Sequence, residues 1–250
     1  FVTLGGMIAA DVHGKNHHKD GSMAACVQWV DVMDAQGHVQ RCSPTKNPEL
    51  FSWVHGAMGL TGIILRAAIK LKKVETGWIS QTTIPAPNLK SAMIMFEGAQ
   101  DHTYSVAWID CLQTGRAMGR SLVMLGEHAT ADQLGFRERR DPFGQSLKRQ
   151  KRLPFDAPDF LLSGPVVKLF NSLYYWKGAR SADTRLVDWD SYFYPLDAIL
   201  EWNRAYGRRG FVQFQCALPL ESAQEGLTAL LAAIAKAGSG SFLAVLKRFG

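Results

Sequence analysis

The sequence predicts an α+β fold, in which a mostly antiparallel sheet carries helices on one face and follows a smaller region of short strands. Two observations favour this class. In the second part of the chain, strand-like runs alternate with helical segments, as expected for units that return to one sheet. In the first part, up to about residue 76, short apolar runs are separated by glycines. With 250 residues, 47% of them hydrophobic, the chain is long enough for one large domain or two modest ones.

The first region is expected to contain a β-hairpin and a further strand. The apolar run that begins at Val27 precedes a turn at residues 35–37, and a second strand is expected to end at Pro44. Residues 62–74, "GIILRAAIKLKKV", change from an apolar run to alternation. This change predicts a strand that leaves the interior.

The second region begins with a helix and a strand. Asn88 is expected to cap a helix that carries Met93, Met95 and Phe96. Residues 103–112, "TYSVAWIDCL", form an apolar run typical of a strand. A long irregular insertion is expected from about residue 126 to 183, because this stretch is rich in proline, glycine and charge.

Strands and helices are then expected to alternate to the end of the printed sequence. Strand character resumes in "TRLVDWDSYFYP", and Pro195 is expected to open a helix that stops at Gly207. Residues 210–219, "GFVQFQCALP", are expected to form a strand. Ser222 and Glu225 predict a capping box for a helix that ends at Gly238. Residues 241–250 are expected to form the last strand.

Charge and composition limit the cellular setting. The formal net charge is +6, and residues 137–152 hold seven cationic side chains against two acidic ones. This stretch favours a polyanion or an anionic membrane surface, or is a solvated loop. No apolar run approaches 18 residues, so we expect no transmembrane helix. Without a basic leader or an initiating Met, the chain is expected to be a piece of a longer protein, cytoplasmic or peripheral at the inner face of the cell membrane.

Residues 5–22, "GGMIAADVHGKNHHKDGS", combine glycines with three histidines. His13, His17 and His18 are metal-ligand types, but adjacent histidines point in opposite directions along an extended segment and no acidic or cysteine cluster completes a set. We therefore expect no metal. The glycines allow close backbone approach and successive N–H groups that receive an anion, which fits a diphosphate-bearing cofactor.

This segment, together with "GLTGIILRA" at 59–67, resembles the second half of the FAD-binding domain of vanillyl-alcohol-oxidase-type (PCMH-type) FAD-linked oxidases. It is most similar to the FAD-dependent decaprenylphosphoryl-β-D-ribose 2-oxidases. The similarity continues through "TYSVAWIDCLQTGRAMGRS", "YPLDAILEWNRAYGRRGFVQFQCALP" and "SGSFLAVLKRFG", and so covers nearly the whole chain. It implies a partial FAD-binding domain at 1–76 and a substrate-binding domain at 77–250.

The resemblance also implies a cofactor site and a catalytic histidine. His13 would lie close to the flavin ring and the substrate sugar, as a catalytic residue or as a structural histidine. The implied FAD-binding residues are Leu4, Gly5, Gly6, Ala10, Asp11, Val12, His13, Gly62 and Ile64. We expect FAD in the intact protein, but little or none in the 250-residue chain alone, because the family's flavin domain has further segments on both sides.

A substrate site is suggested by the second region. Alternation in "SFLAVLKRF" places Lys247 on an apolar strand face, where a cation is costly unless it is paired, functional or able to reach solvent. Gln213 and Gln215 share a face of the strand expected at 210–219, and the three side chains would line one polar pocket. The resemblance favours this pocket, gives Lys247 a catalytic role as well, and places Trp108 against the substrate, although a core position is equally compatible with that tryptophan.

The resemblance implies an FAD-linked oxidoreductase that oxidises the 2-hydroxyl of a polyprenyl-phosphoryl ribose to the 2-keto sugar, an intermediate toward the arabinose form used in the cell envelope. The implied partners are the lipid-linked sugar, a short-chain reductase that completes the epimerisation, and an anionic membrane, with no nucleic acid. Two alternatives remain open. One is an FAD sugar or aldonolactone oxidase with a soluble substrate, and the other is a non-catalytic module that binds polyanions or membranes.

Overall fold

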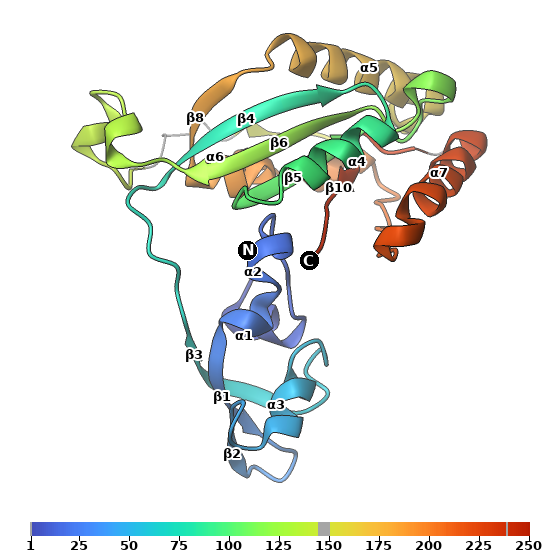
Figure 1. The fold of residues 1–250 in the computed structure, drawn as a ribbon. Coiled ribbons are helices and arrows are strands. Elements are labelled where there is room, and N and C mark those ends of the chain that lie inside the picture. Colours follow the sequence, from blue (N-terminus) through green and yellow to red (C-terminus); the bar gives the residue numbers. More distant parts are fainter. Residues whose placement is uncertain (1, 145–150, 239) are drawn as a thin grey trace. The chain divides into compact units, whose positions relative to one another are not determined.

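The computed structural model describes residues 2–144, 151–238 and 240–250 (Figure 1). The chain divides into two compact units, one formed by Phe1–Lys73 with Arg248–Gly250 and the other by Val74–Lys247. The last three residues therefore fold with the first unit. Part of the basic stretch at 137–152, including Lys148 and Arg149, lies outside the described residues.

The first unit is built on a three-stranded antiparallel sheet. Its strands are β1 (Val27–Met33), β2 (Val39–Cys42) and β3 (Ile63–Ile69), in the order β2-β1-β3. The predicted hairpin is confirmed, and Asp34 closes its turn by accepting hydrogen bonds from the backbone N–H groups of Gln36 and His38, both at 2.9 Å. The second strand ends two residues earlier than expected, because a turn that pairs Ser43 with Lys46 follows it.

Short helices complete this unit. They are α1 (Leu4–Ala9), α2 (His17–Asp20), a 3-10 turn at Met23–Cys26 and α3 (Pro48–Val54). The side chains that form the core of the unit are Ile8, Val27, Val30, Val32, Cys42 and Val54. Asp31 is buried in β1 and pairs with Arg41 and Arg66, at 2.7 and 2.9 Å. Hydrogen bonds from Arg41 hold the pKa of Asp31 below its usual range.

The second unit is built on a five-stranded antiparallel sheet. Its strands are β4 (Trp78–Ala86), β5 (Tyr104–Ile109), β6 (Ser121–His128), β8 (Thr184–Asp188) and β10 (Val245–Leu246). The order is β10-β5-β6-β4-β8, so β10 and β8 are the edge strands. The α+β class with a mostly antiparallel sheet is confirmed.

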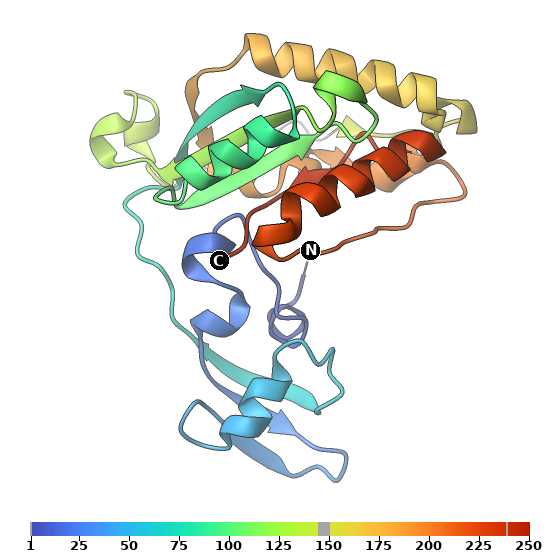
Figure 2. The same ribbon diagram turned by 45° about the vertical axis from the view of Figure 1, so that its right-hand side comes forward.

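Helices cover both faces of this sheet, so the expectation of one covered face is wrong (Figures 1 and 2). On one face, Phe96 of α4 (Leu89–Gly98) packs in a core cluster with Val123, and α7 (Leu220–Ala237) contacts α4. On the other face, Tyr174 of α5 (Gly164–Arg180) packs on Trp108, and α6 (Trp189–Phe193) lies nearby. The physical reason lies in β5, whose six residues are all buried and need a cover on each side.

The segment expected to be irregular holds much of this cover. Residues 126–183 contain the end of β6 and the seventeen-residue helix α5, so that expectation is wrong. The sequence of α5 has no clear amphipathic pattern, because the outward side of this helix is apolar as well as the side that faces the sheet. The helix predicted to follow Asn88 forms as α4, and the Asn88 cap is confirmed, since its side chain accepts a hydrogen bond from the Ser91 N–H at 2.9 Å.

The expected helix between Pro195 and Gly207 is also wrong. This segment forms a 3-10 turn (Pro195–Ala198), the strand β9 (Ile199–Leu200) and a second 3-10 turn (Trp202–Tyr206). β9 pairs in parallel with β7 (Lys151–Arg152), and this pairing interrupts the helix. The remaining 3-10 turns of the unit are Gly115–Ala117, Ala131–Gln133, Glu138–Arg140 and Asp159–Leu162.

The last helix differs from its prediction at one end. α7 begins after Pro219, and the Ser222 hydroxyl donates to the Pro219 carbonyl, so the expected capping box with Glu225 does not form. The predicted end is confirmed, because Gly238 follows the helix with φ of 67°, a left-handed conformation that glycine adopts easily. Among the described residues, no helix is both long and apolar enough to cross a membrane.

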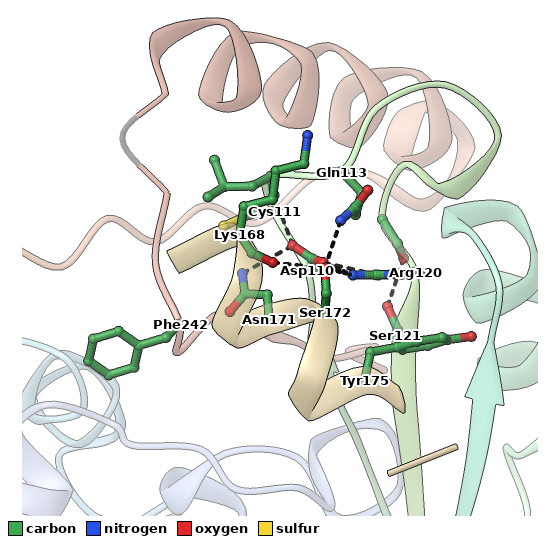
Figure 3. Close-up of polar contacts among 12 residues, drawn as sticks. Asp110, Cys111, Gln113, Arg120, Ser121, Lys168, Asn171, Ser172, Tyr175 and Phe242 are labelled. Atoms are coloured by element: carbon green, nitrogen blue, oxygen red, sulfur yellow. Dashed lines mark hydrogen bonds and ion pairs between the residues drawn. The ribbon is translucent and has the colours of Figure 1, made fainter. Parts of the chain in front are cut away.

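A buried polar network fastens α5 to the sheet (Figure 3). Asp110 follows β5 and is fully buried, and its carboxylate accepts hydrogen bonds from the Arg120 guanidinium at 2.8 and 3.0 Å. Asn171 of α5 donates to the same carboxylate at 3.0 Å, and Arg120 also donates to Ser172 at 2.8 Å. The ring of Tyr175 lies 4.8 Å from the Arg120 guanidinium. The network joins β5, the start of β6 and α5.

We expect Asp110→Asn to destabilise the second unit by about 3 kcal/mol, because it leaves the largely buried Arg120 without its counter-charge. Urea unfolding followed by circular dichroism measures this change. Glu225→Gln, at an exposed position on α7, is the matched control and should change the free energy of unfolding by less than about 0.5 kcal/mol. Equal stability of the two variants would contradict a structural role for the network.

Candidate functional site

A glycine-lined cavity of about 320 Å³ lies in the first unit, between α1 and the start of β3. The cavity brings together four of the residues predicted to bind a cofactor. Gly5 and Gly6 belong to α1, whereas Gly62 and Ile64 lie more than fifty residues later, at the start of β3. The complete lining is Gly5, Gly6, Ala9, Met58, Gly59, Gly62, Ile63 and Ile64.

The backbone that forms the cavity is fixed from both sides. Ile8 buries α1 in the core, and the Thr3 side chain caps this helix by accepting from the Gly6 N–H at 3.1 Å. The loop before β3 is tied to the end of α1, because the Met58 N–H donates to the Ala9 carbonyl at 2.9 Å. The cavity is therefore part of the folded unit, and its walls do not depend on long flexible side chains.

The glycines at the two walls have different roles. A Cβ at Gly62 would lie 2.5 Å from the Met33 carbonyl oxygen and 2.8 Å from a methyl group of Val32, and φ of Gly62 is 131°. Gly62 is thus required by the close approach of β3 to β1. A Cβ at Gly5 would meet nothing within 4 Å. Packing within the described chain therefore gives no reason for glycine at position 5, and the space above it is open to a ligand.

The segment from Ala10 to Val12 is not part of the cavity lining. Asp11 has φ of 42°, and its carboxylate accepts hydrogen bonds from the Ser22 hydroxyl and the Ala24 N–H, both at 2.8 Å. The Ala10 N–H donates to the Gly6 carbonyl, the Val12 N–H donates to the Met7 carbonyl, and the Val12 carbonyl accepts from the Met23 N–H. These contacts hold residues 13–18, which carry His13, His17 and His18 and which we call the histidine loop. The cofactor contacts of Ala10, Asp11 and Val12, and of the half-exposed Leu4, stay predictions.

His13 belongs to an aromatic cluster with the end of the chain. Its ring lies 4.7 Å from Phe249 and 5.6 Å from His17, and Phe249 lies 4.2 Å from His17. The Gly250 N–H donates to Nδ1 of His17 at 3.3 Å. His17 therefore anchors the last residues on the histidine loop, and Phe249 packs against His13. No group of three potential metal ligands occurs within the residues that the structure describes.

The residues predicted to bind substrate lie in the second unit. Trp108 of β5 is buried, donates from Nε1 to the Phe242 carbonyl at 3.0 Å and packs on Tyr174 at 4.8 Å. These contacts give it a core position, and its contact with substrate stays a prediction. Lys247 follows β10 and is half-buried, and no ion pair with it occurs among the described residues. Burial lowers the pKa of the Lys247 ammonium group below its usual value of 10.5.

The strand expected at 210–219 is absent, so it cannot align its glutamines beside Lys247. Gln213 and Gln215 lie in an exposed extended segment, in which the neighbouring Val212 is 97% exposed. The alternation in this segment is compatible with a strand, but a strand also needs a hydrogen-bonded neighbour, which alternation does not specify. The substrate contacts of both glutamines stay predictions.

Comparisons with known proteins match the start of the chain to an FAD-binding domain. A sequence profile described as "FAD binding domain" matches residues 1–43, which include α1 and the histidine loop. A protein of Streptomyces coelicolor that has no assigned function is 30% identical over 258 residues, which cover the whole chain and 68% of that protein. The decaprenylphosphoryl-beta-D-ribose oxidase of Mycolicibacterium smegmatis is 33% identical over 252 residues, which cover the whole chain and 54% of the oxidase.

The chain belongs to the FAD-linked oxidase family. It spans about half the length of the Mycolicibacterium oxidase. A shorter match, at 38% identity over 82 residues, joins 32% of the chain to 15% of cytokinin dehydrogenase 3 of rice, Oryza sativa.

The lining of the cavity suits a part of FAD that is flat or apolar. Gly5 and Gly6 expose backbone without a side chain, Ile63 and Ile64 supply an apolar wall, and Gly59 keeps the opposite loop small. The open space at Gly5, which a Cβ would enter, is the observation that fits a ligand. The sequence did not predict four lining residues: Ala9, Met58, Gly59 and Ile63. Of these, Ile63 had a signal in its position between the predicted Gly62 and Ile64. The packing role of Phe249 was also missed.

Two glycine substitutions separate the packing role from the binding role. We expect Gly62→Ala to destabilise the first unit by roughly 2 kcal/mol or more, because its Cβ overlaps the backbone of β1. We expect Gly5→Leu to leave the free energy of unfolding unchanged within about 0.5 kcal/mol but to weaken FAD binding by the full-length protein at least roughly tenfold, because the side chain fills the cavity.

The control for Gly5→Leu is Gly98→Leu at the end of α4, where a Cβ also meets nothing within 4 Å. It should alter neither stability nor FAD affinity. The cavity is not the cofactor site if Gly5→Leu binds FAD as tightly as Gly98→Leu. Urea unfolding and titration with FAD, followed by flavin fluorescence, provide the two readouts.

Proposed function

We propose that the full-length protein is an FAD-dependent oxidoreductase that oxidises the 2-hydroxyl of a polyprenyl-phosphoryl ribose to the 2-keto sugar. The observation that carries this proposal is the glycine-lined cavity, which brings together four of the predicted FAD-binding residues. The chain that forms it belongs to the family of FAD-linked oxidases. The substrate class is taken from the similarity to decaprenylphosphoryl-beta-D-ribose oxidase over the whole chain.

In this proposal, the cavity residues hold the cofactor. Gly5 and Gly6 allow the backbone of α1 to approach it, and Gly62 with Ile64 contacts the adenosine end. A bound flavin supplies the two-electron acceptor that oxidation of a CH–OH group requires. Leu4 and the segment from Ala10 to His13 line the remainder of the cofactor.

The chain's own residues handle the substrate and its proton. Lys247 is half-buried and its pKa is lowered, so its amine binds a phosphate as an ammonium group and exchanges a proton more readily than a free lysine does. Trp108, Gln213 and Gln215 position the sugar. His13 orients the substrate or accepts the hydroxyl proton, and its ring is held by Phe249, which follows Lys247 by two residues in the chain.

The proposal includes the partners that such a reaction requires. A short-chain reductase consumes the 2-keto sugar and completes the epimerisation toward the arabinose form. The lipid-linked substrate brings the protein to the inner face of the membrane as a peripheral protein. Nucleic acid is not a partner in this proposal.

The experiment is reduction of the flavin in the full-length protein under anaerobic conditions. We expect a phosphoribosyl polyprenyl lipid to bleach the flavin absorbance, and free ribose and aldonolactones to leave it unchanged. Bleaching by a soluble sugar or aldonolactone alone would replace the proposal with the soluble-substrate oxidase. No bleaching by any of these, in a protein that holds FAD, would overturn the proposed substrate class.

We expect Lys247→Met to weaken substrate binding about 10- to 100-fold with unchanged flavin content, because it removes a charge-assisted hydrogen bond to the phosphate. Lys236→Met on the exposed side of α7 is the control and should change neither quantity. Steady-state kinetics with the phosphoribosyl lipid and the flavin-to-protein absorbance ratio measure the two effects. Equal loss of flavin and substrate binding would contradict the assignment of Lys247.

The pH dependence gives a second readout for Lys247. Phosphate binding needs the ammonium form, and burial lowers the pKa of this group. We therefore expect kcat/KM to fall as the pH rises through a value below 10.5, and we expect this limb to disappear in Lys247→Met. A limb that survives the substitution unchanged would assign the titration to another group.

A further inference from the structure

The helix α5 has an unusual composition for a helix at the surface of a protein. Its seventeen residues, Gly164–Arg180, include three cationic side chains and no acidic one. The cations are Lys168, Lys177 and Arg180, and Lys177 and Arg180 lie in the last turn, where they also complement the helix dipole. Most of the other side chains are aliphatic or aromatic.

One side of α5 is occupied by the sheet. Val167 and Asn171 are buried, and the Tyr175 hydroxyl donates to the Ala86 carbonyl of β4 at 3.3 Å. A Cβ at Gly178 would overlap the side chain of Leu122 on β6, so the helix lies close to the strand there. The buried polar network around Asp110 fixes the same side (Figure 3).

The opposite side of α5 is apolar and exposed. Leu169, Leu173 and Trp176 are spaced by four and three residues, which places them in one row along the helix. Steps of 100° per residue put this row about 180° from Val167 and Asn171. The three side chains are 62%, 58% and 53% exposed. We call this row the outer stripe. The outward side of a helix that covers a sheet is normally polar, so the outer stripe is not explained by the fold.

The cations accompany the outer stripe. The guanidinium of Arg180 lies 3.6 Å from the ring centroid of Trp176, and Lys168 and Lys177 are both exposed beside the stripe. A helix with aliphatic and tryptophan side chains on its outward side, flanked by lysine and arginine, has the composition of helices that lie in the plane of a membrane interface. Anionic lipid headgroups would complement the three cations, and acyl chains would receive the stripe.

We propose that the outer stripe, with Lys168, Lys177 and Arg180, docks the protein on an anionic membrane surface. The charge of α5 favours a membrane over a second copy of the chain as the binding partner of the outer stripe. Two α5 helices that pack stripe to stripe would bring six cations together without an acidic residue from either helix. An anionic bilayer removes this repulsion. The proposal concerns α5 alone, and it holds or fails independently of the flavin chemistry.

The experiment is sedimentation of the full-length protein with vesicles of phosphatidylcholine, either alone or mixed with phosphatidylglycerol. We expect binding to the mixed vesicles and much weaker binding to pure phosphatidylcholine. Replacing Lys168, Lys177 and Arg180 together by glutamine should weaken binding to the mixed vesicles roughly 100-fold, because each cation near an anionic surface contributes about a factor of five. Added salt should weaken the wild-type protein similarly.

The apolar part is tested by replacing Leu169, Leu173 and Trp176 together by serine, which should weaken binding to the mixed vesicles at least roughly tenfold. The matched control replaces Val212 and Phe214 by serine, since these side chains are exposed on a segment outside α5. The control variant should bind as the wild type does. Circular dichroism checks that each variant folds. If the serine variant does not fold, the glutamine variant of the three cations still tests whether α5 binds the membrane.

Two results would overturn the proposal. In the first, neither α5 variant changes binding to the mixed vesicles, and the double substitution Lys151→Gln with Arg152→Gln abolishes this binding. The basic stretch would then be the membrane contact. The other is a self-associated wild-type protein in which the serine variant is monomeric and vesicle binding is unchanged, because the stripe would then bind a second copy. Analytical ultracentrifugation measures the latter.

Discussion

The close approach of β3 to β1 at Gly62 is the constraint on which the candidate cofactor site depends. No side chain fits there, because a Cβ would meet the Met33 carbonyl oxygen at 2.5 Å. This contact places Ile63 and Ile64 opposite α1, and the hydrogen bond from Met58 to Ala9 closes the loop between them. An added Cβ would meet nothing within 4 Å at Gly5, so internal packing does not explain the open space there.

Two features of the second unit connect its fold to its proposed roles. Lys247 lies at the end of the edge strand β10, where burial lowers its pKa, and the chain continues directly to Phe249 on the histidine loop. α5 joins a polar network on its inner side to an apolar stripe on its outer side. The network fixes the helix against the sheet. Since hydrogen bonds hold the inner side of α5, its outer side is free to carry exposed apolar side chains.

The sequence predicted those parts of the fold that local signals determine. The hairpin around Asp34, the helix after Asn88 and the end of α7 at Gly238 are confirmed, because turn and capping residues act on their immediate neighbours. α5 was missed, because apolar residues on both of its sides erase the amphipathic pattern. The strand around Gln213 was wrong, because pairing needs a partner that alternation does not identify. Glycines predicted four cavity residues, whereas the network at Asp110 depends on contacts between segments about sixty residues apart.

Hydrogen exchange of the full-length protein with and without FAD tests the cofactor site most directly, because it reports on backbone amides and needs no substitution. If FAD occupies the glycine-lined cavity, the amides of residues 4–9 and 59–64 exchange more slowly in the presence of FAD, while those of α7 keep their rates. FAD binding without slower exchange in either of the two segments would contradict the account.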